Sequence, residues 1–224
     1  MIATRGLLSD DASTEIYVVT NEVIPDNIVS EARKEVSICI DSQLPFDLSP
    51  DKTHKRCLIT FSTSTIISEE QMKEFKGGCW NIHPASYNYP GRDPHHYASY
   101  DKVDNYGACV HKMEASVDSG EILMAIEKVV SNESKTPDAY LKMGLETGLI
   151  LLKDCVDEIA KNGGISSING CLYKWGSRKT IRADLKKLCR ITTDMTKKEI
   201  EDRERACISS NFNNLWLDES EWSN

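Results

Sequence analysis

The chain of 224 residues is long enough for one domain with a substantial core, and its 40% hydrophobic and 28% charged residues are ordinary for a globular protein. Its net charge of −8 argues against a nucleic-acid-binding surface, because such surfaces need clustered Lys and Arg. No apolar stretch approaches the roughly 20 residues of a membrane span, and no apolar signal-peptide region follows Met1.

Eight cysteines are spread along the chain without a CxxC pair, and several lie inside apolar runs, such as Cys39 and Cys109. Buried free thiols are typical of a reducing compartment, so we expect a cytoplasmic protein. The adjacent His95 and His96 point to different faces of a short helix, and no metal-ligand spacing recurs around them. We therefore expect no metal site.

Strand-like and helix-like segments alternate along the first part of the chain. Apolar and β-branched runs predict four strands, at 15–19, 36–40, 57–61 and 79–82. Helix formers predict helices at 25–35 and from Ser68 to Gly77, and residues 42–56 form a loop without periodicity. Such alternation favours right-handed βαβ units and a mostly parallel, Rossmann-like sheet with flanking helices, an α/β fold.

The second part of the chain contains the clearest helix, over 137–162. Leucines at 141, 145, 149 and 152 continue to Val156 and Ile159 as one apolar stripe, which predicts core packing. Before this helix, a Pro-rich loop at 84–94 leads to a short helix at 95–102. Strands at 107–113 and 122–130 follow, and we expect them to pair across a loop that contains Asp118.

The last 62 residues have a different character, with small helices and turns in place of strands. We expect residues 1–162 to form the α/β domain and residues 163–224 a small helical and irregular appendage. A homodimer through segment 203–217 is one arrangement left open. No GxGxxG or GxxxxGK[ST] motif opens the chain, so binding of NAD or ATP in the usual way is not expected.

Three polar residues carry the chemistry that the sequence suggests. Asn81 and His83 are two positions apart on one strand, so their side chains share a face. An amide donates to a developing oxyanion, and an imidazole donates or accepts near neutral pH. Asp118 supplies a carboxylate that would orient the ring. One amide, one imidazole and one carboxylate suffice for acyl transfer to an amine.

Four blocks in order resemble the formyltransferase family that uses 10-formyltetrahydrofolate. They are Asn81-Ile82-His83-Pro84, Tyr89-Pro90-Gly91-Arg92-Asp93-Pro94, Gly107-Ala108-Cys109-Val110-His111 and Val117-Asp118-Ser119-Gly120-Glu121-Ile122-Leu123. The resemblance covers about residues 57–130, and extends more weakly to 171–215. Relative to the family, the part of the chain before Asn81 looks shortened, and the glycine-rich first turn is not visible.

The resemblance implies direct formyl transfer. Asn81 and His83 would stabilise the tetrahedral oxyanion, and Asp118 would hold His83. Two segments match regions that line the family's folate pocket, and their residues are Ser64, Thr65, Ile66, Ala85, Ser86 and Tyr87. Tyr89 and His95 would face the acceptor. We expect His111 and Trp175 to be packing residues.

The acceptor and the reaction type remain open at the level of sequence. A nucleotide-linked amino sugar is the favoured acceptor, since the charge disfavours tRNA and the missing phosphate turn disfavours glycinamide ribonucleotide. A formyltetrahydrofolate hydrolase would use the same three residues with water. A non-catalytic binder of folate or another ligand would keep only the fold.

Overall fold

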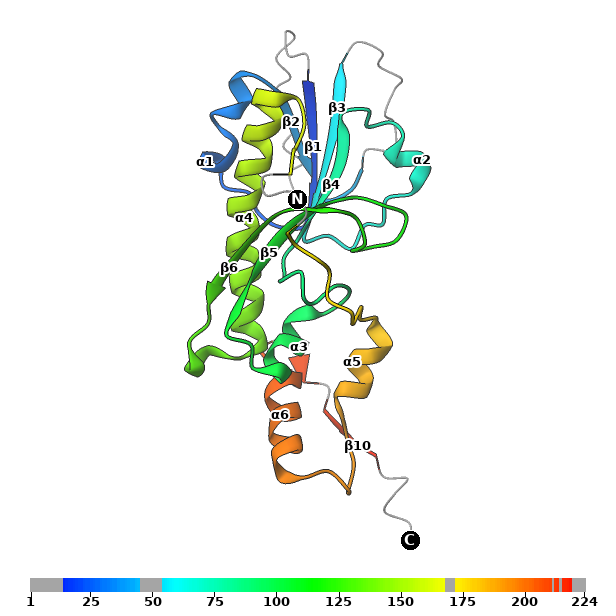
Figure 1. Ribbon diagram of the computed structural model, residues 1–224, viewed down its shortest axis with the longest axis vertical. Helices are drawn as coiled ribbons and strands as arrows, with labels where there is room; N and C mark the ends of the chain where they lie inside the picture. Colours follow the sequence, from blue (N-terminus) through cyan, green and yellow to red (C-terminus); the bar gives the residue numbers. More distant parts are fainter. Residues whose placement is uncertain (1–13, 45–53, 168–171, 211, 214, 219–224) are drawn as a thin grey trace.

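A computed structural model describes residues 14–44, 54–167, 172–210, 212–213 and 215–218. Its centre is a sheet of six strands in the order β2-β1-β3-β4-β5-β6 (Figure 1). The strands are β1 (Thr14–Thr20), β2 (Ser37–Asp41), β3 (Lys55–Phe61), β4 (Gly78–His83), β5 (Asn105–Lys112) and β6 (Ile122–Val129). The first four are parallel, and β5 and β6 complete the sheet as antiparallel strands. The predicted α/β fold with a mostly parallel sheet is thus confirmed.

The helices are mostly short. They are α1 (Asp26–Val29), η1 (Ala32–Lys34), α2 (Glu69–Met72), α3 (Pro94–Asp101), η2 (Asn132–Ser134), α4 (Pro137–Asn162), α5 (Arg182–Leu188) and α6 (Lys197–Cys207). The single helix predicted over 25–35 is wrong, because this segment forms α1 and η1 separately. A segment of this length depends on packing more than on propensity, and its buried apolar side chains are Val29 and Ala32, with Ile28 partly buried against the core. Part of the predicted 42–56 loop lies outside the described residues.

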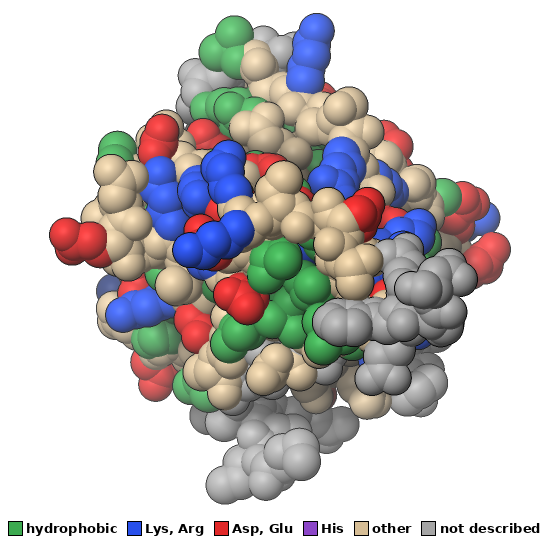
Figure 2. Space-filling model, turned by 90° about the horizontal axis from the view of Figure 1, so that it is seen from below, with side chains coloured by type: hydrophobic (Ala, Val, Ile, Leu, Met, Phe, Trp, Pro, Cys, Tyr) green, Lys and Arg blue, Asp and Glu red, His purple; other side chains and the backbone are tan. Residues whose placement is uncertain are grey.

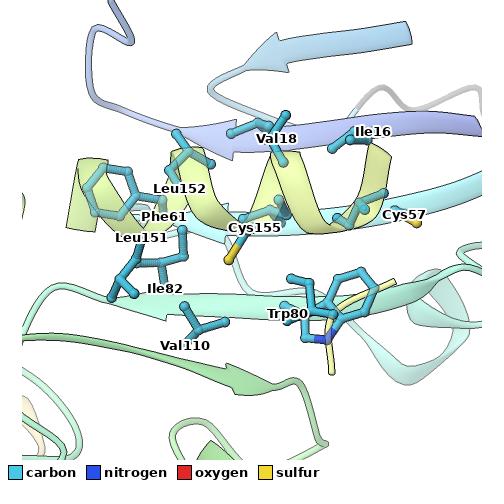
Figure 3. Close-up of a cluster of buried hydrophobic side chains, with 14 of the residues drawn as sticks. Ile16, Val18, Cys57, Phe61, Trp80, Ile82, Val110, Leu151, Leu152 and Cys155 are labelled. Carbon is cyan, nitrogen blue, oxygen red and sulfur yellow. The ribbon is translucent and has the colours of Figure 1, made fainter. Parts of the chain in front are cut away.

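The long helix α4 covers one face of the sheet. Figure 3 shows Leu151, Leu152 and Cys155 of α4 against Ile82 and the other strand residues of the core. The predicted leucine stripe is only half right, since Leu152 is buried but Leu141 is not. In the first half of α4, the buried positions are Pro137, Tyr140 and the small residues Gly144, Thr147 and Gly148.

Two glycines bring the first half of α4 unusually close to the sheet. A Cβ atom on Gly144 would lie 2.0 Å from the carbonyl oxygen of Pro84, and one on Gly148 would lie 2.4 Å from the ring of Phe61. Neither distance is compatible with a side chain. The backbone of α4 therefore packs directly against the residue that follows His83 on leaving β4.

The C-terminal residues pack at one end of the molecule, next to α3 (Figure 1). They add four two-residue strands, β7 (Arg190–Ile191), β8 (Ile208–Ser209), β9 (Phe212–Asn213) and β10 (Trp216–Leu217). The guanidinium of Arg205 donates to the carbonyl oxygens of Ser99 and Tyr100, and these bonds join α6 to α3. Seen from below, this end carries charged side chains of both signs around a group of hydrophobic ones (Figure 2).

Two structural features are absent from the described residues. No helix among them is long and apolar enough to cross a membrane. No group of three or more His, Cys, Asp and Glu side chains within the same residues could hold a metal ion. The core cysteines, such as Cys57, Cys109 and Cys155, are free thiols.

Candidate active site

Strand alternation places the polar residues of β4 on the sheet face opposite α4. Trp80 and Ile82 point into the core, so Asn81 and His83 point to the other face. On β5, which pairs with β4, His111 lies directly opposite Asn81. The loop between β5 and β6 brings Asp118 over this face, where it is 5% exposed.

His83 is held between a backbone carbonyl and a carboxylate. Its Nε2 lies 2.9 Å from the carbonyl oxygen of Tyr89. Because a carbonyl oxygen only accepts, Nε2 donates in this bond. Nδ1 then faces Asp118, with 3.6 Å between Nδ1 and Oδ2. When the ring gains a second proton at Nδ1, Asp118 is in place to balance its charge.

His111 lies between Asn81 and the same carboxylate. Its Nδ1 donates to the carbonyl oxygen of Lys112 at 2.8 Å, so in a neutral ring Nε2 accepts the Asn81 N–H. The Asn81 Nδ2 atom lies 3.0 Å from His111 Nε2, which is 3.3 Å from Asp118 Oδ1. On the other side, the hydroxyl of Thr60 donates to Asn81 Oδ1 at 2.7 Å. An amide has two N–H donors, and the described residues bind only one of them. The second N–H is available to a substrate oxygen.

The Asp118 carboxylate is strongly stabilised in its ionised form. Burial alone would raise its pKa, but the nearby His83, the contacts with His111 and the hydrogen bond from the Gly91 N–H together outweigh burial. They lower the pKa of Asp118 to about 2. The carboxylate therefore stays charged throughout the neutral range.

This depressed pKa predicts an acid-sensitive contribution to stability. Since the folded pKa lies below the ordinary value, the contribution is complete above about pH 5 and is lost as the pH falls towards 2. Over this pH range we expect the unfolding free energy of the wild-type protein to fall by about 2 kcal/mol more than that of Asp118→Asn. Urea unfolding of both proteins at several pH values measures the difference. Parallel pH profiles would contradict the prediction.

The site opens into a cavity of about 680 Å³. Asn81, His83, His111 and Asp118 all line it. One part of the wall is the loop 62–67 after β3, where Ile66 is 73% exposed. Another part is formed by residues 91–95 and 179–182. A volume of this size is typical of pockets for small molecules and cofactors.

Only some of the binding residues predicted from the sequence line the cavity. Ser64, Thr65 and Ile66 line the cavity, and so does His95, whose pKa burial lowers to about 3. That ring is therefore neutral near pH 7.

Four of the predicted binding residues, Ala85, Ser86, Tyr87 and Tyr89, do not line the cavity. Ala85 and Ser86 are buried, and the Ser86 hydroxyl donates to Glu127. The ring of Tyr87 packs against that of Tyr173 instead. The Tyr89 hydroxyl donates to Asp101, so this residue meets the site only through its carbonyl oxygen.

His111 and Trp175 are not assigned to the site by sequence analysis. His111, expected to pack, lies between Asn81 and Asp118. The ring of Trp175 meets the rings of both His83 and His111 edge-on, at centroid distances of 5.8 and 5.0 Å. The alternation of β5 identifies His111. Val110 is buried and faces α4, so the next residue, His111, must lie on the other face of the sheet, opposite Asn81. The weaker resemblance over 171–215 includes Trp175 but gives it no part in the site.

An amide, two imidazoles and an ionised carboxylate at the wall of a cavity are groups that acyl transfer can use. The formyl transferase family model matches residues 17–156, well over half of the chain. The chain belongs to the formyl transferase family.

Solved structures share the fold at low sequence identity. A sugar N-formyltransferase from Shewanella sp FDAARGOS_354 superposes with a TM-score of 0.71 at 20% identity, covering 91% of this chain and 92% of that one. A 4-N formyltransferase from Francisella tularensis gives 0.66 at 21% identity, covering 92% and 93%. The sugar 3N-formyl transferase WlaRD, in the presence of dTDP and 5-N-formyl-THF, gives 0.62 at 17% identity, covering 90% and 84%.

Proposed function

We propose that this protein transfers a formyl group from 10-formyltetrahydrofolate to the amine of a nucleotide-linked amino sugar. The observation that carries the proposal is the connected set Asn81, His111, Asp118 and His83 at the wall of one cavity. The folate-bound and nucleotide-bound relative with the same fold supports the choice of the two substrates.

The residues around the loop 62–67 fit a folate. The exposed side chain of Ile66, with Ile67 and Met113 beside it in the cavity wall, offers an apolar surface for a flat ring system. Ser64 and Thr65 add hydroxyl groups for its polar edge. When bound, the folate supplies the formyl group as an activated acyl donor.

The other polar residues have separate parts in the transfer. The free N–H of Asn81 donates to the formyl oxygen as it gains negative charge, which stabilises the transition state. His83, paired with Asp118, donates or accepts the proton that the attacking amine loses and the departing nitrogen needs. The neutral His95 lines the cavity and is available to accept a hydrogen bond from the acceptor.

Two arginines in the cavity wall offer guanidinium groups to an anionic acceptor. They are Arg92 and Arg182, and the wall also contains the carboxylates of Asp93, Glu114 and Asp118. Arg92 is 3.7 Å from Asp93, whereas Arg182 forms no ion pair with any described residue. Guanidinium groups bind phosphate oxygens well, so the diphosphate of a nucleotide-linked sugar is a suitable partner.

The test is a formyl-transfer assay with 10-formyltetrahydrofolate and a panel of amines, including nucleotide-linked amino sugars. Tetrahydrofolate release and a mass gain of one formyl group on the amine are the expected results. Formate release without any amine would replace the proposal by a hydrolase. Folate binding without turnover of either kind would leave a binding protein.

Residues 163–224 are also proposed to support self-association through segment 203–217. Ile208, Trp216 and Leu217 in this segment are exposed apolar side chains, at 45%, 36% and 60%. Analytical ultracentrifugation of the full chain measures its oligomeric state. A strictly monomeric protein at micromolar concentration would contradict this part of the proposal.

A further inference from the structure

The segment 172–181, which we name the strap, runs without helix or longer strand to the start of α5, and parts of it lie against the active site (Figure 1). It lies beyond residues 17–156, which match the family model. Its residues contact two loops of the active site, 88–92 after β4 and 114–121 between β5 and β6.

The loop that carries Asp118 has a conformation that needs support. Asp118 has a φ of 47°, in the left-handed region that L-residues with side chains seldom adopt. Such a conformation persists only when the surrounding structure holds it. The carboxylate itself receives the N–H of Gly91 at 2.8 Å.

The strap binds this loop on both sides of Asp118. Before it in the chain, the Lys179 ammonium donates to the carbonyl oxygen of Val117 and, at 2.9 Å, to the hydroxyl of Ser116. After it, the indole N–H of Trp175 donates to the carbonyl oxygen of Gly120 at 2.8 Å. Two side chains of the strap therefore fix the backbone within two residues of Asp118 in each direction.

Trp175 also contacts the two imidazoles that flank the carboxylate. Its ring meets His83 at an interplanar angle of 71° and His111 at 82°. One indole thus packs against both partners of Asp118 while its N–H holds the adjoining loop.

The backbone of the strap is itself anchored to the loop after β4. Thr180 donates its N–H to the carbonyl oxygen of Pro90 at 3.1 Å, and Arg92 donates its N–H to the carbonyl oxygen of Thr180 at 3.0 Å. Gly91, between them, has a φ of 100° and no room for a side chain, since a Cβ would lie 2.2 Å from the Thr180 oxygen. The strap therefore also places the N–H that Gly91 donates to Asp118.

We propose that Trp175 and Lys179 are positioning residues, which hold Asp118 at the distance and angle that His83 and His111 require. The strap then belongs to the active site, because it positions Asp118. This inference rests on the proposed formyl transfer for its kinetic readout. It adds a role for residues that neither the family match nor the sequence pattern identifies.

The experiment removes each strap bond while keeping most of the side chain. Lys179→Met loses the ammonium, and Trp175→Phe keeps an aromatic ring but loses the N–H. Lys174→Met is a matched control, because Lys174 is an exposed residue of the same strap. Trp216→Phe is the second control, because the Trp216 N–H donates to the Lys186 carbonyl at 3.1 Å, away from the site.

We expect Lys179→Met and Trp175→Phe to lower kcat by about 10- to 100-fold, because small displacements of reacting groups have effects of this size. In Trp175→Phe, KM for both substrates should change by less than about threefold, since Trp175 does not line the cavity. Lys179→Arg should recover most of kcat, and both controls should match the wild type.

Hydrogen–deuterium exchange of residues 114–121 gives a second readout that does not depend on turnover. We expect faster exchange there in Lys179→Met and Trp175→Phe, with the rest of the sheet unchanged. Wild-type kcat in both variants, or unchanged exchange in this loop, would overturn the inference. A wild-type protein without formyl transfer would instead refute the proposed function, and the exchange comparison would still decide the role of the strap.

Discussion

Replacing Asp118 by asparagine is expected to lower kcat by about 10²- to 10⁴-fold, the range typical of losing a general acid–base group. The asparagine side chain has nearly the same shape and tolerates the left-handed φ of 47° at this position. It has no negative charge, so a protonated His83 would lose the partner that lies 3.6 Å from its Nδ1. Steady-state kinetics at saturating folate measures the effect.

A matched variant separates this effect from general loss of charge near the site. Glu114 also lines the cavity but has no contact with His83 or His111 among the described residues. Glu114→Gln should keep kcat within a few-fold of the wild type. If Asp118→Asn remained folded by circular dichroism and were equally active, the carboxylate would have no part in proton transfer.

Replacing Asn81 by alanine is the second large expected effect, a fall in kcat of about 10²- to 10³-fold, the usual result of removing one oxyanion donor. The side-chain amide of Asn81 accepts a hydrogen bond from Thr60 and contacts His111 through one N–H. Its remaining N–H is the donor available to the formyl oxygen. KM should change little, because the donor acts mainly on charge that develops in the transition state.

Asn81→Asp tests the same role with a side chain of equal size. It replaces the N–H donor by a second carboxylate close to Asp118, so it should be at least as damaging as alanine. Asn105→Ala, at the exposed start of β5, is the control and should be fully active. High activity in Asn81→Asp would rule out an oxyanion donor at this position.

Strand alternation is the part of the fold that sequence predicts best. Trp80 and Ile82 are apolar and lie in the core, so the polar residues between and after them must share the other face. Periodicity is less reliable for α4, where the leucine stripe suggests that Leu141 is a core residue, although only Leu145 and the later members of the stripe pack against the core. Close packing through Gly144 and Gly148 decides the orientation of that half of the helix, and periodicity does not detect a contact made by a missing side chain.

The candidate site is predictable where one element or one resemblance supplies the residues. Asn81 and His83 come from a single strand, and Asp118 follows from a matching block. Tyr89 is six residues from His83, yet only its carbonyl oxygen reaches the ring. Trp175 lies more than 50 residues after Asp118 in the chain, on a segment without helix or strand. The path of such a segment depends on tertiary contacts, which no local pattern encodes.

The close contact of Gly144 with Pro84 has a practical consequence for altering the acceptor range. Leu141, one turn earlier on α4, lines the cavity, whereas Gly144 fixes the distance between the helix and the end of β4. The residue that shapes the pocket and the residue that fixes the helix are therefore separate. Engineering of new acceptor specificity can vary the size of the side chain at 141 while glycine at 144 keeps His83 in register.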